Sequence, residues 1–453
     1  MTEFLTAAQA AERLGVKPAT LYAYVSRGVL RRDRASDGRG SLFDSEEVER
    51  LARRGRPRRP AGVADITVES AITEITGDRL RYRGHDATRL AVTRTFEEVA
   101  ELLWTGEFPA QPPGQTAAPA PPQAPISPQA PEPWQATPAA LAAGRAAQAA
   151  LPVGTLPLER FQVIVPAMAA TDPLRLQLDP AAVVAAGRSI IAGLVDCLPP
   201  AASDYPVSDY PVSDYPGTDY PGTDYPISGY PSADYPGTDY PIADRLWPRL
   251  CDRRASPLLR RALSAALVLL ADHELAASTL AARAAASVRA DPYAVVATGM
   301  GAVGGALHGG ASLGAEAMLA AAAGPDDVPR VVGELLRRGE KVPGFGHFVY
   351  RTGDPRAVLL LDLVRRAAPK SGQLAVAEAV LAEVRRKSLP EPNIDFAIAT
   401  LARVAGMVRG SGEAVFAVAR TAGWIAHALE AYAGPGPLRP RAVYTGRPPV
   451  VGR

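Results

Sequence analysis

Apolar residues recur at helical spacing along most of this 453-residue chain, and this feature limits its possible folds more than any other. Residues 142–200 and 245–434 are rich in Ala, Leu, Val and Arg, with apolar side chains at positions i, i+3 and i+4. This spacing gathers the apolar side chains on one face of an α-helix, where they can pack against neighbouring helices. A chain of this length can bury a large core. We therefore predict a body that is mainly α-helical.

Three segments depart from the helical pattern. Residues 66–84 are rich in β-branched side chains around Gly77 and Asp78, which predicts a short β-hairpin. Residues 109–140 are rich in Pro, Ala and Gln, a composition that prevents a helix or a central strand. Residues 203–242 repeat a Tyr-Pro pentapeptide with too few apolar side chains to build a core. We predict that the last two are disordered insertions, although the repeated tyrosines could bind a partner as an extended tract.

The basic character of the chain is concentrated in its first 60 residues. They carry 13 Lys and Arg against 8 Asp and Glu, whereas the remaining residues carry 36 against 39. The net charge is therefore +5 for the first segment and −3 for the remainder. This difference indicates an acidic partner for the first segment only.

Residues 1–60 also follow the plan of a winged helix-turn-helix domain. A helix, a tight turn and a second helix precede two short strands around Asp37 and Gly38, and Asp44 with Glu47 forms a capping pair for a third helix. The segment resembles DNA-binding modules of the MerR-like and excisionase-like type, which implies DNA as a partner. A small packing module with a solvated basic face is the alternative. The side chains available to DNA are Thr20, Tyr22, Arg27, Arg31, Arg32 and Arg39.

The cysteines and the N-terminus indicate the cellular location. Cys197 and Cys251 flank the Tyr-Pro repeat without the spacing of a disulfide framework or a metal site, which favours a reducing cytoplasm. The N-terminus lacks the basic and apolar pattern of a secretion signal. Residues 292–315 lack formal charge but are rich in glycine, so we interpret them as buried and expect no membrane partner.

Three short segments place an ionisable side chain beside a turn or a helix start. They are residues 305–311 (GALHGGA), 342–356 (VPGFGHFVYRTGDPR) and 393–396 (NIDF). His308 and His347 lie among glycines, which let the backbone approach a ligand closely, and Asp395 opens an apolar helical run. Two histidines and a carboxylate are sufficient for acid/base chemistry at carbon. We predict that these three residues form the active site.

A fourth glycine-rich pattern is misleading. Gly299, Gly301 and Gly304 match the G-x-G-x-x-G pattern of dinucleotide-binding proteins. That pattern binds a dinucleotide only after a strand of a βαβ unit, and the surrounding sequence here is helical. We expect these glycines to allow close packing of helices instead.

A series of motifs outside the two insertions, from residue 66 to residue 447, resembles the citrate synthase family in content and order. The motifs are ESAITEITGDRLRYRGHD, FEEVAELLWTGEFP, ADHELAAST, DPYAVVATGMGAVGGALHGGA, KVPGFGHFVYRTGDPRA, NIDFAIA, ARTAGWIAHALE and LRPRAVYTG. The resemblance implies a large helical domain made of residues 61–108, 141–309 and 412–447. It implies a small helical domain of residues 310–411.

The resemblance also implies a reaction and a role for each site residue. The family condenses acetyl-CoA with oxaloacetate. Asp395 would remove a proton from the methyl group of the thioester, His308 would donate to the developing oxyanion, and His347 would polarise the oxaloacetate carbonyl. The residues implied to bind oxaloacetate are His273, Arg356, Arg420 and Arg439, and those implied to bind CoA are Val342, Gly344, Gly346 and Arg351.

The partners implied by the family are acyl-CoA, oxaloacetate and a second copy of the chain. Arg439 would reach the site of the neighbouring subunit, which implies a homodimer. Acyl-CoA is a substrate, so we expect no cofactor and no metal. Acetyl-CoA and propionyl-CoA differ by one methylene, and the sequence does not separate them.

Alternatives remain at the level of the whole chain and of single residues. A transcription regulator could use the same body to sense acyl-CoA or oxaloacetate while the N-terminal segment binds DNA. The presence of Asp395 favours catalysis, because binding alone requires no proton abstraction. We interpret His85 and His427 as ordinary structural histidines, and Arg420 alone could be a structural ion-pair partner.

Overall fold

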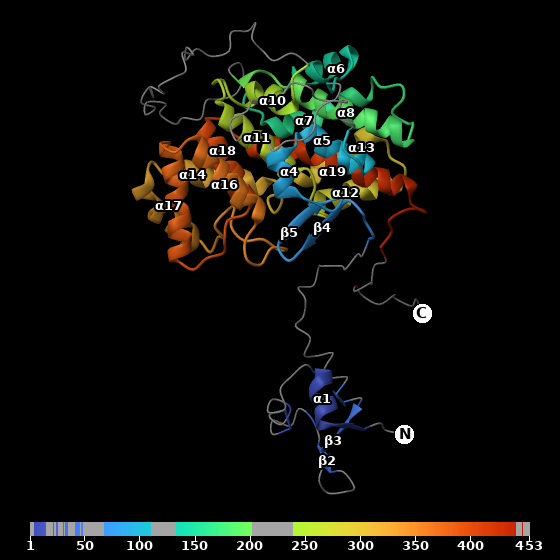
Figure 1. Ribbon diagram of the computed structural model, residues 1–453, viewed down its shortest axis with the longest axis vertical. Helices are drawn as coiled ribbons and strands as arrows, with labels where there is room; N and C mark the ends of the chain where they lie inside the picture. Colours follow the sequence, from blue (N-terminus) through green and yellow to red (C-terminus); the bar gives the residue numbers. More distant parts are fainter. Residues whose placement is uncertain are drawn as a thin grey trace, which may run out of the picture. The chain divides into compact units, whose positions relative to one another are not determined.

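The computed structural model describes residues 4–14, 21, 24–25, 30, 32–34, 41–45, 47–48, 68–109, 133–201, 239–440 and 446. The chain divides into two compact units, Met1–Val68 and Glu69–Arg453. Helices dominate the described part of the second unit (Figure 1). The prediction of a mainly α-helical body is therefore confirmed.

The described residues of the first unit form a small sheet and a helix. Its elements are β1 (Phe4–Thr6), α1 (Ala7–Leu14), β2 (Asp33–Arg34) and β3 (Ser41–Asp44). Both outer strands pair antiparallel with β3, and Ala10, Leu21 and Phe43 belong to its own buried core. The two predicted strands are confirmed, whereas the pairing of β1 with β3 was not predicted. The capping pair is present, since Oδ1 of Asp44 accepts from the N–H of Glu47 at 3.1 Å.

A three-stranded antiparallel sheet opens the second unit. Its strands are β4 (Thr73–Thr76), β5 (Arg79–Tyr82) and β6 (His85–Asp86). Gly77 and Asp78 form the turn between β4 and β5, both with φ of 56°, so the predicted hairpin is confirmed and β6 extends it. The buried hydroxyl of Tyr82 donates to the carbonyl oxygens of Leu269 at 3.1 Å and Asp272 at 3.0 Å. These bonds fix the sheet to the chain segment that carries His273.

Most helices of the second unit pack around one long, buried helix, α19 (Ser411–Ala433), which runs through the middle of Figure 1. Most residues of α19 are buried on every face of the helix, as expected for a helix inside a large core. The helices of this part of the unit are α4 (Ala87–Thr93), α5 (Phe96–Thr105), α6 (Pro138–Gln148), α7 (Pro157–Ala169), α8 (Pro180–Cys197), α10 (Ile242–Leu250), α11 (Pro257–Leu270), α12 (Ala277–Ser287) and α13 (Pro292–Val303). Of these, α5, α7, α8, α11, α12 and α13 contact α19.

A second group of helices, coloured orange, gathers at one side of this unit in Figure 1. The group consists of α14 (Gly310–Ala320), the short 3₁₀ helix η2 (Pro325–Asp327), α15 (Val328–Arg337), α16 (Pro355–Ala367), α17 (Gly372–Arg386) and α18 (Ile394–Ala405). Within it, α18 packs against α14, α16 and α17, and it also contacts α11 and α19. The two groups therefore meet where α14, α16 and α18 contact α11 or α19.

The glycine pattern at residues 299–304 lies on α13 and its C-terminal end. Gly299 packs against the indole of Trp424, where a Cβ would lie 2.6 Å from the ring. The strands among the described residues pair only antiparallel and no βαβ unit occurs there. Close helix packing, as expected, explains this glycine.

The end of the segment predicted as a disordered insertion at 109–140 is ordered. Trp134 is buried and stacks on Trp104 with 5.2 Å between ring centroids, and Thr137 caps α6. Aromatic burial and a helix cap therefore override the high proline content here. Residues 110–132 and 202–238 lie outside the described residues, and with them most of both predicted insertions.

One described helix, α8, is long and apolar enough to span a membrane by length and composition. It packs against α6, α7, α10, α13 and α19, and more than half of its residues are buried. Burial in a protein core accounts for its apolar composition. Cys197, at its end, and Cys251 are buried free thiols.

Candidate active site

His308 lies in the turn before α14, and a serine of α12 contacts its ring. Nε2 of His308 lies 2.7 Å from Oγ of Ser278, and Nε1–H of Trp424 donates to the same oxygen at 3.3 Å. The turn is tight, because a Cβ at Gly309 would lie 2.7 Å from the carbonyl oxygen of Val303. The glycine after His308 thus allows the chain to turn where the histidine is presented.

His347 lies in the loop between α15 and α16, and the main chain fixes its tautomer. Nδ1 accepts hydrogen bonds from the N–H groups of Val349 at 3.0 Å and Tyr350 at 3.4 Å. A neutral imidazole has one donor nitrogen, so its proton is on Nε2. That Nε2 lies 3.5 Å from Nη2 of Arg356, which is also a donor. Two donors cannot satisfy each other, so an oxygen of a bound molecule is a suitable acceptor for the Nε2–H of His347.

Asp354 connects the segment of residues 342–356 with the segment of residues 393–396. Its carboxylate accepts from Nε and Nη2 of Arg356 at 2.9 and 2.8 Å, and its Oδ2 accepts from the N–H of Ile394 at 3.0 Å. Asp354 caps α16, and Asn393 caps α18 by accepting from the N–H of Asp395 at 3.0 Å. Asp395 therefore lies in the first turn of an apolar helix, as predicted, and Asp354 holds that turn next to Arg356.

His273 is buried in the turn between α11 and α12 and lies against His347. Its Nε2 lies 3.0 Å from the hydroxyl of Tyr350, and 5.1 Å separates the centroids of the two imidazole rings. The guanidinium of Arg356 lies 5.4 Å from the centroid of the Tyr350 ring. Two predicted histidines and one predicted arginine thus share Tyr350 as a neighbour.

Arg420 lies on α19 and has an unused donor. Its side chain is only 1% exposed, and its Nε donates to the carbonyl oxygen of Leu270 at 2.8 Å. Its Nη1 is buried and has no hydrogen-bond partner among the described residues. A buried cation with an unpaired donor is costly unless an anion binds it, and a carboxylate fits a guanidinium well. The arrangement suits an anionic ligand.

Burial makes the three histidines neutral near pH 7. Together with the charge on Arg420 it lowers the pKa of His308 to about 4, and together with the charge on Arg356 it lowers the pKa of His347 to about 4. Burial, followed by the charges on Arg356, Arg420, His347 and His308, lowers the pKa of His273 well below its ordinary value. The charge on Arg420 acts on His308 and His273, and the charge on Arg356 acts on His347 and His273, so His273 links the other two rings into one group.

The pKa of Asp395 is raised, in contrast to the lowered pKa values of the three histidines. Burial raises its pKa to about 7, and the negative charge on Asp354 adds to the shift, while the charges on Arg356 and Arg420 oppose it. A carboxyl group with a pKa near the working pH can both take up and release a proton. This group is therefore suited to general base catalysis.

The predicted CoA-binding glycines shape the loop before His347. Gly344 and Gly346 have φ of 80° and 81°, and their carbonyl oxygens accept from the N–H and Nδ2 of Asn393, both at 2.9 Å. A Cβ at Gly344 would lie 2.7 Å from Cβ of Phe396. Val342 is buried at the start of the loop. The loop thus lies directly against the first turn of α18.

Two predicted site residues lie apart from the buried group. Arg351 is exposed, and its main-chain N–H donates to Oδ1 of Asp78 at 2.9 Å. Arg439 is also exposed, and it follows Leu438, whose N–H donates to Oγ of Ser287 at 2.9 Å. Neither arginine joins the buried group within this chain.

The predicted DNA-contacting residues belong to the first unit. Arg32 is exposed. The other five lie outside the described residues and are Thr20, Tyr22, Arg27, Arg31 and Arg39.

Three residues of the group were not singled out from the sequence, namely Ser278, Tyr350 and Asp354. Each of them lies inside a motif that was noted. A signal existed for Asp354, because an aspartate before a proline marks the start of a helix. No comparable signal exists for Ser278 and Tyr350, because their role depends on contacts with residues far away in the sequence.

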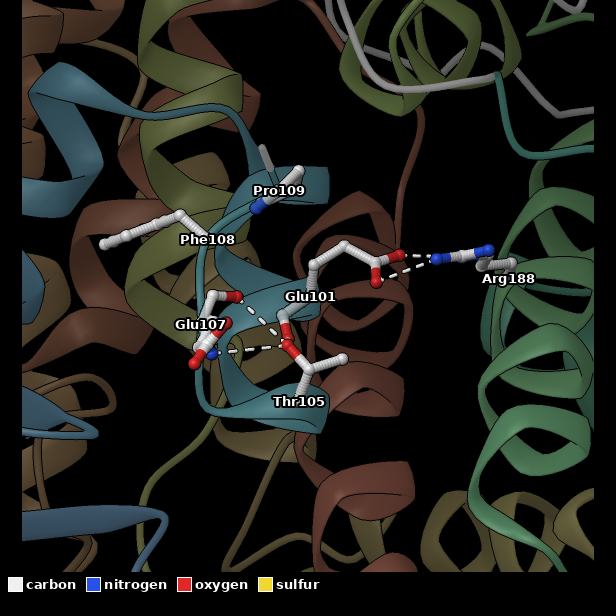
Figure 2. Close-up of a pocket in the computed structure, with 6 residues that line it drawn as sticks. All are labelled: Glu101, Thr105, Glu107, Phe108, Pro109 and Arg188. Atoms are coloured by element: carbon white, nitrogen blue, oxygen red, sulfur yellow. Dashed lines mark hydrogen bonds and ion pairs between the residues drawn. The ribbon is translucent and has the colours of Figure 1, made fainter. Parts of the chain in front are cut away.

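A cavity of about 230 Å³ lies elsewhere in the second unit and contains none of the predicted site residues. Figure 2 shows that Glu101 points towards Arg188 across it, and the two side chains form a pair of hydrogen bonds at 2.6 and 2.8 Å. The other residues around it are Thr105, Glu107, Phe108 and Pro109. Because its buried carboxylate is already paired, this cavity is a weaker candidate for acid/base chemistry.

Comparison with known families gives two matches along the chain. The family described as "Citrate synthase, C-terminal domain" matches residues 62–441. The family described as "Helix-turn-helix domain" matches residues 4–56. The two matches together span most of the sequence.

Curated relatives carry the name of the first of these families. Citrate synthase 2 of Bacillus subtilis is 37% identical over 212 residues, which cover 45% of this chain and 56% of the relative. Citrate synthase of Haloferax volcanii is 38% identical over 193 residues, which cover 42% of this chain and 51% of the relative. The matched part of the chain thus spans about half the length of these relatives.

Two solved structures share the fold. The structure of citrate synthase from Thermotoga maritima has a TM-score of 0.60 and 24% identity, with 87% of this chain and 97% of that chain covered. The second is a ternary complex of carboxymethyl coenzyme A and oxaloacetate with citrate synthase from Thermoplasma acidophilum. It has a TM-score of 0.63 and 22% identity, with 85% of this chain and 95% of that chain covered.

Proposed function

Since this chain belongs to the citrate synthase family, we propose that it condenses acetyl-CoA or propionyl-CoA with oxaloacetate and water, giving citrate or 2-methylcitrate and free CoA. One observation carries the proposal. Two neutral histidines and a carboxyl group with a pKa of about 7 are grouped with two buried arginines. This combination provides a base, hydrogen-bond donors and an anion site together.

The first step is formation of the enol of the thioester. Asp395 takes a proton from the carbon next to the thioester carbonyl, and His308 donates to the carbonyl oxygen as negative charge develops there. The contacts of Ser278 support this role. Because Trp424 donates to Oγ of Ser278, the serine hydroxyl is available to donate to Nε2 of His308, which puts the histidine proton on Nδ1.

The second step forms the carbon–carbon bond. The enol carbon attacks the keto carbon of oxaloacetate, and the keto oxygen becomes a hydroxyl by gaining a proton. The Nε2–H of His347, with Nη2 of Arg356 beside it, is suited to polarise that oxygen. Water then cleaves the thioester of the intermediate, which releases CoA and leaves a third carboxylate on the product.

Arginines hold the carboxylates of oxaloacetate in this proposal. Arg420 has an unpaired buried Nη1, and Arg356 lies beside His347. His273 contributes a further contact through its position against His347. Arg439 is exposed, which is compatible with reaching the site of a second copy, so we propose a homodimer. An arginine binds a carboxylate with two parallel hydrogen bonds, which fixes the substrate's orientation.

The loop before His347 binds CoA in this proposal. Val342, Gly344 and Gly346 give this loop its shape, since both glycines have positive φ, and the exposed Arg351 provides positive charge for the phosphates of CoA. We further propose that the reaction takes place in the cytoplasm, in keeping with two buried free thiols.

Release of CoA tests the proposed reaction. Purified protein is incubated with acetyl-CoA or propionyl-CoA, with and without oxaloacetate, while free thiol is recorded and the product is identified by mass. Thiol release that requires oxaloacetate and yields citrate or 2-methylcitrate is expected. A dimeric, folded protein that releases no thiol with either donor would contradict the proposal.

A second function is proposed for the first unit, because residues 4–56 match a helix-turn-helix family and this segment is basic. The unit binds DNA, and the second unit could report acyl-CoA or oxaloacetate to it. A mobility-shift assay of the full chain at low and high salt tests this, since phosphate contacts weaken as salt rises. A loss of the shift in Arg32→Ala is expected, and no shift at any salt concentration would refute DNA binding.

A further inference from the structure

The sequence predicts an ordinary structural role for His427, yet this histidine contacts the residue next to His273. Both His427 and Asp272 are fully buried, and Nε2 of His427 lies 3.3 Å from Oδ2 of Asp272. Oγ1 of Thr73 donates to the same carboxylate oxygen at 2.6 Å. The other oxygen of Asp272 has no partner among the described residues. Two donors therefore hold this carboxylate.

The protonation state of His427 follows from Arg283. Nη1 of Arg283 lies 3.0 Å from Nδ1 of His427, and a guanidinium can only donate. Nδ1 must therefore accept, so His427 is neutral with its proton on Nε2, directed at Asp272. Arg283 is itself held by Oε2 of Glu430 at 2.7 Å and by the carbonyl oxygen of Glu69 at 3.1 Å.

One face of α19 holds the chain segment 270–273 through three successive contacts. Arg420 donates from Nε to Leu270 at 2.8 Å, the N–H of Gly423 donates to Ala271 at 3.0 Å, and His427 donates to Asp272. A Cβ at Gly423 would collide with Oδ1 of Asp272, so the segment lies directly on the helix. His273 comes next in this segment.

We propose that His427 is a positioning residue for the oxaloacetate side of the site. By donating to Asp272 it keeps residues 270–273 in register with α19, and so holds His273 and Arg420 at the separation that oxaloacetate requires. This inference rests on the proposed function. A positioning role differs from a purely structural one, because it affects one substrate and not the other.

Three variants separate these roles. His427→Phe keeps a planar ring but removes the donor, and His427→Gln keeps an N–H that can reach Asp272. Tyr293→Phe is the matched control, because it removes a hydroxyl of a buried side chain at the start of α13, which donates to Asp172 at 2.9 Å and not to the segment 270–273. Each full-length protein is compared with wild type for oxaloacetate binding by calorimetry and for kcat and the KM of both substrates.

For His427→Phe we expect the Kd and KM for oxaloacetate to rise about tenfold, because a buried hydrogen bond to a charged group is lost. The KM for acyl-CoA should stay within about twofold, His427→Gln should recover most of the loss, and Tyr293→Phe should behave as wild type. Equal changes in both KM values, or an unchanged Kd for oxaloacetate, would overturn the inference while leaving the proposed function intact.

Two further outcomes keep the tests distinct. If wild type neither binds nor consumes oxaloacetate, the proposed function and this inference both fail. If His427→Phe does not fold, the nitrogen NMR chemical shifts of the His427 ring in wild type test the inference instead. The Nε2–H tautomer is the expected result, and a proton on Nδ1 or a charged ring would overturn the inference.

Discussion

Asp354 accepts a hydrogen bond of 3.0 Å from the main-chain N–H of Ile394, although 40 residues separate them in the sequence. The same carboxylate pairs with Arg356 through two hydrogen bonds. One buried side chain thus sets the position of a cation and of the helix turn that carries Asp395. The catalytic geometry in our account depends on this contact.

Replacing Asp354 with asparagine should damage stability and activity together. The change leaves the buried guanidinium of Arg356 without its counter-charge, which costs about 3–5 kcal/mol in buried pairs. The free energy of unfolding from denaturant titration and the rate of CoA release are the measurements. Asp362→Asn is the control on the same helix, since its pair with Arg366 is exposed and worth less than about 1 kcal/mol. Similar losses in both variants would contradict the role of Asp354.

Gly344→Ala should destabilise the protein more than Gly339→Ala. Both glycines have positive φ, 80° and 75°, which costs an alanine roughly 1–2 kcal/mol. Only at Gly344 would the new Cβ meet Phe396, at 2.7 Å, whereas nothing lies near Gly339. This collision should cost Gly344→Ala about 1 kcal/mol more than Gly339→Ala. It should also lower the rate of CoA release by Gly344→Ala. Denaturant titration of both variants checks this, and equal unfolding free energies would refute it.

The raised pKa of Asp395 predicts a pH-dependent effect on stability. The folded state binds the proton more tightly than the unfolded state, with a pKa of about 7 against an ordinary value of 3.8. This stabilisation is complete below pH 4 and is lost as the pH rises through 7. Asp395→Asn does not titrate, so it should be more stable than wild type at pH 8, by on the order of 2 kcal/mol, with a smaller difference at pH 5.

Unfolding of wild type and Asp395→Asn by denaturant at several pH values checks this difference. Burial also raises the pKa of Glu413 to about 7, but Glu413 titrates in both proteins and cancels in the comparison. A constant difference between pH 5 and pH 8 would show that Asp395 keeps an ordinary pKa.

Arg420→Lys should weaken oxaloacetate binding without a matching effect on acyl-CoA. Lysine keeps the charge but cannot offer the planar pair of donors that a carboxylate fits. We expect the KM for oxaloacetate to rise about 10- to 100-fold. Saturation curves for each substrate at a fixed level of the other measure this. An unchanged KM for oxaloacetate would favour the alternative in which Arg420 is only structural.

The sequence predicted the helical body and the sheet at residues 73–82 because both depend on local patterns. Helical apolar spacing and a Gly-Asp turn are features of neighbouring residues. It also named His308, His347 and Asp395, because each lies in a short motif whose order along the chain resembles a known family.

Contacts between distant residues could not be predicted in this way. Trp134 lies in a proline-rich segment, and its burial against Trp104, far away in the sequence, helps to order the end of that segment. Ser278 meets His308 across 30 residues, and His427 meets Asp272 across 155. A single sequence carries no local signal for such pairs, so the partners that orient the catalytic groups appeared only in the structure.

Release of CoA from acetyl-CoA in the presence of oxaloacetate, measured side by side for wild type and Asp395→Asn, tests directly whether this carboxylate is the catalytic base. Asn cannot accept the proton, so the rate should fall by about 100-fold or more while the variant still folds and binds oxaloacetate. A variant that releases CoA at the wild-type rate would contradict the account.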